Sequence, residues 1–180
     1  MLVSLLTHCR EMQKSTNTGQ LVLDSLCGLT GNDMPQVRRV IWQRQRADAL
    51  LLKHIQQYRS ALVYPAAEQE SDKAAHLQHY IIIDATWQQA QKMLNQSPYL
   101  FHLPRVSLAA EKSAYQLRRN QRSQGLCTSE TVAQLMRIHG QTELAQRLNS
   151  ALDQLQEGRE PAGQTQAVTR ERLTDWRQRF

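Results

Sequence analysis

The strongest constraint on the fold is a short apolar run that ends on an acid and leads directly into the start of a helix. Tyr80-Ile81-Ile82-Ile83 is followed by Asp84 and then by Ala85-Thr86-Trp87. Three consecutive β-branched residues are typical of a strand that helices cover on both faces, as in a parallel sheet. Thr86 and Gln89 fit a capping box, in which each side chain satisfies a backbone N–H of the other residue.

The junction at Asp84 is therefore a candidate site. Ligands of open parallel sheets bind outside the carboxyl ends of the strands, where loops and helix starts offer free backbone N–H groups. The alternative is that Asp84 and Thr86 serve only to cap a helix, since such junctions are common.

Strand and helix patterns alternate along most of the chain. We expect strands at 2–6, 37–42, 61–64, 80–84 and 105–108, and helices at 19–26, 48–58 and 87–95. Two further helices follow, one that Thr128-Ser129 caps and Gly140 ends, and one that ends at Gly158. This order predicts an α/β fold with a mainly parallel sheet flanked by helices. A single helix over 37–58 is an alternative, but the leading β-branched residues and the capping residue Asp48 favour a break.

Length and composition predict one main domain. A chain of 180 residues with 41% hydrophobic residues can bury a substantial core. We expect a domain over 1–158, a polar surface loop over 65–75, and a linker with a C-terminal helix over 159–180 that packs on the domain. No apolar run is long enough for a membrane span and no basic flank precedes the first apolar residues, so we expect a cytoplasmic protein without membrane contact.

The cysteine and histidine patterns do not predict a metal site. Cys9, Cys27 and Cys127 are odd in number and widely spaced, which excludes a disulfide framework and a CxxC zinc motif. We expect these thiols to be mostly buried. His76 and His79 have the spacing of a ligand pair but no third ligand nearby, so we expect solvated histidines.

The charge of the chain points to an anionic partner. The net charge is +6, and 17 of the 22 basic residues are arginine, the side chain that forks onto phosphates and stacks on bases. One basic cluster (Arg105, Lys112, Arg118, Arg119 and Arg122) faces a single acid in its segment and favours RNA contact. A second cluster over 170–179 is more typical of a solvated surface.

Four sequence blocks resemble, in the same order, the DTW-domain family of tRNA-uridine aminocarboxypropyltransferases, which are related to the knotted SPOUT methyltransferases. The blocks are His8-Cys9-Arg10-Glu11 with Ser15-Thr16-Asn17-Thr18-Gly19, then Asp84-Ala85-Thr86-Trp87, then Ser97-Pro98-Tyr99-Leu100 with Leu103-Pro104-Arg105, and Tyr115-Gln116-Leu117-Arg118-Arg119 with Cys127-Thr128-Ser129-Glu130. Three positions depart from the family pattern: Ala85 replaces a glycine, Cys127 replaces a serine and Thr131 replaces an alanine. The family's cysteine-rich zinc cluster has no counterpart before His8, so we expect no structural zinc.

The resemblance implies a reaction and a fold. The reaction is transfer of the 3-amino-3-carboxypropyl group of S-adenosylmethionine to N3 of a tRNA uridine, with release of methylthioadenosine and without a metal. The fold would be SPOUT-like, with a C-terminal knot. Two alternatives are a SPOUT-type RNA methyltransferase and a non-catalytic RNA-binding protein.

The resemblance also implies three groups of site residues. The catalytic group is Asp84, Thr86 and Trp87; the donor-binding group is Leu103, Pro104, Leu117, Arg118, Thr128, Ser129 and Glu130; the RNA-binding group is Arg10, Thr16, Asn17, Thr18, Arg105, Arg119 and Arg122. Asp84 is expected to act as general base on N3–H, to orient the uracil edge, or to bind the ammonium group of the donor. The turn at Thr16 to Gly19 either holds a phosphate or simply caps a helix.

Overall fold

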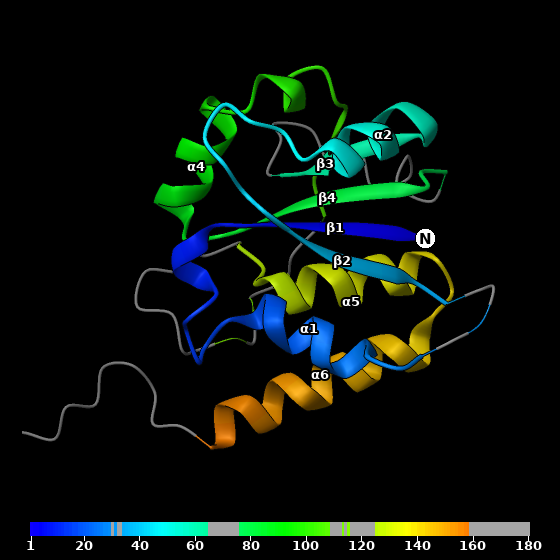
Figure 1. Ribbon diagram of the computed structural model, residues 1–180. Coiled ribbons are helices and arrows are strands. Elements are labelled where there is room, and N and C mark those ends of the chain that lie inside the picture. Colours follow the sequence, from blue (N-terminus) through cyan, green and yellow to red (C-terminus); the bar gives the residue numbers. More distant parts are fainter. Residues whose placement is uncertain are drawn as a thin grey trace, which may run out of the picture.

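The computed structural model describes residues 1–29, 31, 34–64, 76–108, 113, 115 and 125–158. Within these residues, five parallel strands form one sheet (Figure 1). The strands are β1 (Leu2–Thr7), β2 (Gln36–Ile41), β3 (Ser60–Val63), β4 (His79–Asp84) and β5 (Arg105–Val106). Their spatial order is β2-β1-β4-β3-β5, and every pairing is parallel. The predicted α/β fold with a parallel sheet is therefore confirmed.

Helices cover both faces of this sheet (Figure 1). On one face lie α1 (Thr18–Leu26), α5 (Thr128–Ile138) and α6 (Thr142–Glu157); on the other lie α2 (Ala49–Gln57) and α4 (Trp87–Asn95). Short 3-10 helices η1 (Cys9–Glu11) and η2 (Pro98–Leu100) follow β1 and α4. The alternative of one helix over 37–58 is wrong, because β2 pairs with β1 and the Asp48 side chain caps α2 by accepting from the backbone N–H of Leu51 at 2.8 Å.

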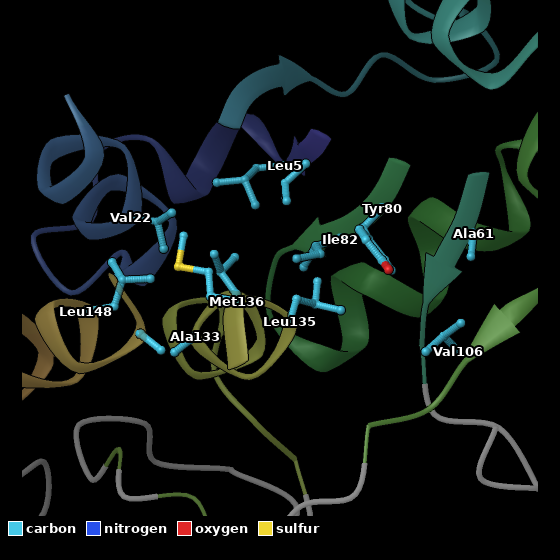
Figure 2. Packing of buried hydrophobic residues seen from close by; sticks show 13 residues of the cluster. Leu5, Val22, Ala61, Tyr80, Ile82, Val106, Ala133, Leu135, Met136 and Leu148 are labelled. Carbon is cyan, nitrogen blue, oxygen red and sulfur yellow. The ribbon is translucent and has the colours of Figure 1, made fainter. Parts of the chain in front are cut away.

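The two faces of the sheet carry separate apolar clusters, because successive side chains of a strand point to opposite faces. Tyr80 and Ile82 of β4 pack toward α5 and α6 with Leu5, Val22, Met136 and Leu148 (Figure 2). Ile81 packs toward α2 and α4 with Leu6, Val40, Leu51, Leu62 and Met93. The central position of β4, buried on both faces, explains the uninterrupted apolar run that the sequence shows.

The C-terminal end of α5 agrees with the sequence prediction. Gly140 has a φ of 75°, a left-handed conformation that glycine adopts without steric cost. The Tyr80 hydroxyl lies 2.7 Å from His139 Nε2 and so links β4 to this end of α5.

Two predictions about single side chains are wrong. His79 is not solvated, because it is the first residue of the central strand β4 and is fully buried. Cys9 and Cys27 are exposed, and only Cys127 is a buried thiol. Both differences come from where each residue lies in its element, which composition does not reveal.

The predicted loop over 65–75 and the predicted linker and C-terminal helix over 159–180 lie outside the described residues, and the knot stays a prediction. Within the described ranges, no helix is both long enough and apolar enough to cross a membrane.

His79 lies between two serines that come from neighbouring strands. Ser60 Oγ donates to the Tyr58 carbonyl oxygen at 3.1 Å, so it accepts from His79 Nδ1 at 2.9 Å. His79 Nε2 then accepts from Ser4 Oγ at 2.9 Å. This arrangement suits a neutral imidazole, and burial together with the nearby His54 and Arg38 lowers the pKa of His79 from 6.5 to about 4.

The buried His79 predicts a loss of stability in mild acid. Between pH 6.5 and about 4 the unfolded chain binds a proton that folded His79 does not bind, so the free energy of unfolding falls as the pH falls. We expect His79 to contribute a loss of about 2 kcal/mol between about pH 7.5 and 5, measured by urea unfolding.

His79→Gln should remove this part of the pH dependence, whereas His102→Gln at an exposed position should keep it. His8, His54 and His139, whose pKa values burial also lowers, remain in both variants. An unchanged pH dependence in His79→Gln would contradict the assignment.

Candidate active site

The carboxyl edge of the sheet joins the ends of β1 and β4. Thr7 and Asp84, the last residues of these strands, are register partners. The backbone N–H of His8 donates to the Asp84 carbonyl oxygen at 3.1 Å, which continues the pairing past the strands. This edge is where ligands of parallel sheets bind.

The Asp84 carboxylate connects four elements at this edge. It is 1% exposed. Oδ2 accepts from Thr7 Oγ1 and from Asn17 Nδ2, each at 3.2 Å, and Oδ1 accepts from Thr128 Oγ1 at 2.8 Å. Asn17 is the N-cap of α1 and Thr128 is the first residue of α5, so the carboxylate lies where two helix dipoles favour negative charge. It therefore joins β1, α1 and α5 to the end of β4.

Gly19 allows α1 to approach this carboxylate closely. A Cβ atom at position 19 would lie 2.7 Å from Asp84 Cγ and 2.9 Å from Oδ1, well inside van der Waals contact. Asn17 secures the same turn, because its Oδ1 accepts from the backbone N–H of Gln20 at 2.6 Å while its Nδ2 also donates to the Glu11 carbonyl oxygen at 3.0 Å. The turn at Thr16 to Gly19 thus caps a helix and holds Asp84; a phosphate contact stays a prediction.

Tyr115 forms a hydrogen bond at the start of α1, and Ser113 forms one at the start of α5. Tyr115 is buried, and its hydroxyl donates to the Thr16 carbonyl oxygen at 2.8 Å. The Ser113 hydroxyl donates to Glu130 Oε2 at 2.6 Å. The Tyr-to-Arg-Arg sequence block is therefore anchored at its first residue beside the residues that hold Asp84.

The start of α5 differs from the prediction by one residue. Cys127, not Thr128, is the N-cap, and its backbone N–H donates to Glu130 Oε2 at 2.7 Å. Thr128 is consequently the first helical residue, and its hydroxyl points to Asp84 instead of the helix backbone. Burial, followed by the charge of Glu130, raises the pKa of the Cys127 thiol to about 12, so this thiol is no nucleophile near neutral pH.

The capping box at the start of α4 is confirmed. Thr86 Oγ1 accepts from the Gln89 backbone N–H at 3.4 Å, and Gln89 Oε1 accepts from the Thr86 backbone N–H at 3.0 Å. Trp87 follows, and its ring stacks on the ring of Tyr64 with centroids 5.4 Å apart.

Not every predicted site residue lies near Asp84. Pro104 is level with Ala61 and Tyr80 in the sheet register, four residues before Asp84 along β4. Leu103 packs on the α2 and α4 face. Arg10 is exposed in η1. Leu117, Arg118, Arg119 and Arg122 lie outside the described residues.

Sequence reasoning missed several residues at this edge. Thr7 and Gly19 contact Asp84, Tyr64 supports Trp87, and buried Glu11 pairs with Lys14 at 2.5 Å. The sequence signal that could have identified Thr7 and Tyr64 is their position, because Thr7 is the last residue of β1 and Tyr64 directly follows β3. In the described part of the chain, no group of three or more His, Cys, Asp or Glu side chains is arranged to hold a metal ion.

The hydroxyl of Ser129 is a buried polar group at this edge. Ser129, the second residue of α5, is 1% exposed, and its Oγ has no hydrogen-bond partner among the described residues. Buried polar groups are nearly always paired, so this hydroxyl at a helix start can bind an oxygen of a ligand.

Comparison with known proteins gives one clear result. The family profile described as the DTW domain matches residues 1–159. No solved structure matches the chain significantly.

The bonds to Asp84 predict a large effect of an isosteric change. Asp84→Asn replaces an acceptor oxygen by an NH₂ group that faces donors, so we expect a loss of about 1–3 kcal/mol in the free energy of unfolding. Urea denaturation measures it, and Asp153→Asn on the exposed face of α6 is the control, with an expected change within about 0.5 kcal/mol. Equal effects of the two variants would refute the role of Asp84.

The close approach of Gly19 predicts a coupled pair. In a helix, Gly→Ala ordinarily stabilises by roughly 0.5–1 kcal/mol, but Gly19→Ala should destabilise because the new methyl group displaces a carboxylate that three hydrogen bonds fix. In an Asp84→Ala background the same substitution should become neutral or stabilising. A double-mutant cycle in urea measures the coupling, and additive effects would contradict the contact.

Proposed function

The chain belongs to the DTW-domain family, and from this premise we propose that it transfers the 3-amino-3-carboxypropyl group of S-adenosylmethionine to N3 of a uridine in tRNA. At the level of the family, the match supports a transferase that modifies tRNA. The observation that carries the finer proposal is the buried Asp84 at the carboxyl edge, whose carboxylate accepts from the starts of α1 and α5 while the signature residues Thr86 and Trp87 begin α4 directly after it.

The proposed reaction forms the bond between N3 and the propyl carbon and breaks the bond between that carbon and sulfur. The electron pair of the broken bond leaves with methylthioadenosine, and the N3 proton is released. When bound, the sulfonium donor supplies the electrophilic carbon. The protein has to hold the donor so that this carbon, not the methyl group, faces N3.

We assign Asp84 a positioning role instead of that of general base. A general base has to come within hydrogen-bond reach of the proton it removes. The carboxylate already accepts three hydrogen bonds, from Thr7, Asn17 and Thr128, so it fixes the turns around the site. Thr86 and Trp87 then start α4 at a defined place beside it.

The start of α5 fits the amino-acid end of the donor. Ser129 offers a buried hydroxyl that has no hydrogen-bond partner among the described residues, and the first backbone N–H groups of a helix favour a carboxylate. Glu130 holds the start of α5 by its bonds to Cys127 and Ser113. We propose that Thr128, Ser129 and Glu130 form this part of the donor site, and that Leu103, Pro104, Leu117 and Arg118 of the other family blocks serve other parts of the donor.

The charge of the chain supports tRNA as the acceptor. The net charge of +6 and the excess of arginine favour a polyanion. We propose phosphate contacts from Arg10, Arg105, Arg119 and Arg122, and contacts from the turn of Thr16, Asn17 and Thr18.

Product analysis tests the proposed reaction. Purified protein is incubated with S-adenosylmethionine and unmodified tRNA, and the digested nucleosides are separated by mass. We expect aminocarboxypropyluridine and an equal amount of methylthioadenosine. Ser129→Ala should raise the donor KM by about 10-fold or more through loss of one hydrogen bond to a charged group, with little change in the KM for tRNA.

Other products would point to other functions. Methyluridine with S-adenosylhomocysteine would indicate a methyltransferase. Binding of tRNA with no heat of donor binding at millimolar concentration would indicate an RNA-binding protein without activity.

A further inference from the structure

An aromatic pair with a neighbouring cation lies at the carboxyl ends of β3 and β4. Tyr64 directly follows β3, and Trp87 is the first residue of α4. Their rings are stacked, with centroids 5.4 Å apart and planes inclined by 22°. The guanidinium carbon of Arg105 lies over the Tyr64 ring at 5.8 Å from its centroid.

These three side chains are not core residues. Tyr64 and Trp87 are only partly buried, and Arg105 is exposed. By contrast, Tyr80 on the adjacent strand β4 is a core residue, because it is fully buried in the apolar cluster between the sheet and α5. A stacked pair that keeps solvent contact beside an exposed arginine matches the way proteins bind unstacked bases.

The pair occupies a different half of the edge from the Asp84 carboxylate. Asp84 faces the starts of α1 and α5, which favour negative charge. Tyr64 packs with the cluster under α2 and α4, on the opposite face of the sheet. In the register Tyr64 follows Val63, the partner of Ile82, so it is level with Ile83, one residue from Asp84.

We propose that Tyr64, Trp87 and Arg105 form the stacking site for the uracil ring that receives the aminocarboxypropyl group; this rests on the proposed function. Charge decides between the two aromatic ligands of the reaction. The donor carries a sulfonium and an ammonium against one carboxylate, so the Arg105 cation disfavours its adenine end at this place. An RNA uridine brings a phosphate that Arg105 attracts.

The kinetic test separates binding of the acceptor from binding of the donor. Tyr64→Leu and Trp87→Leu remove one ring each, and Tyr64→Phe keeps the ring. We expect the KM for tRNA to rise at least about 5-fold in the leucine variants, the range of one base stack, while the donor KM changes less than about 2-fold and Tyr64→Phe resembles the parent. A rise confined to the donor KM would overturn the proposal, because it would assign the rings to adenine.

The matched control is the second aromatic stack of the same edge. His8 and Trp42 lie with centroids 5.8 Å apart, and Trp42 Nε1 donates to buried Ser97 at 3.0 Å. Trp42→Phe should leave the KM for tRNA unchanged. An increase as large as that of Trp87→Leu would mean that the effect is not specific to the proposed site.

Direct binding gives a second measurement that needs no catalysis. In a Trp42→Phe/Trp176→Phe protein, Trp87 is the remaining tryptophan, and a short oligouridylate should quench its fluorescence. Quenching by methylthioadenosine alone, without an effect of the oligouridylate, would refute the proposal. A parent protein that forms no aminocarboxypropyluridine would refute the proposed function, whereas quenching would still decide the stacking site.

Arg105→Gln tests the third residue of the proposed site, and it should not disturb folding because Arg105 is exposed. Loss of one phosphate contact should lower the slope of log K for tRNA against log salt by about 0.7–0.9. An unchanged slope would remove Arg105 from the site.

Discussion

The geometry of the site depends on how one buried carboxylate obtains its hydrogen bonds. Asp84 accepts from a strand hydroxyl, a cap amide and a helix hydroxyl, each contributed by a residue at least 44 positions away from Asp84 in the sequence. An unpaired carboxylate in this place would be costly, so the three donors and the acid require one another. Gly19 adds the steric condition, since any side chain there would collide with the carboxylate. The signature residue Asp84 therefore fixes the surrounding turns through these hydrogen bonds.

The edge of the sheet around Asp84 has two chemically different halves. On the α1 and α5 side, helix starts and the Ser129 hydroxyl, which no described residue pairs with, favour anionic oxygen. On the α2 and α4 side, the stacked rings of Tyr64 and Trp87 favour a planar base. The proposed transfer from S-adenosylmethionine to a nucleobase needs both environments, and the end of β4 lies between them.

Local signals in the sequence predicted the elements but not their long-range partners. The capping box of Thr86 and Gln89 lies within four residues, so it could be identified directly. The surroundings of His79 could not, because Ser4 and Ser60 become its neighbours only through strand register. Thr128 was mistaken for a cap because its hydroxyl is of the type that caps helices, whereas here it turns to Asp84 and Cys127 takes the cap position. The pairing of Tyr64 with Trp87 likewise requires knowledge of which strands are adjacent.

The strand order has a consequence for how the chain folds during its synthesis on the ribosome. β1 and β3 have no contact with each other in the sheet, and β4 lies between them. A nascent chain that has released β1, β2 and β3 consequently holds two separate pieces whose strand edges are unpaired and whose apolar faces are open to water. Only when residues 79–84 leave the exit tunnel can these pieces close into one sheet, so the interval before β4 emerges is the period in which the growing chain is most exposed to chaperones and to self-association.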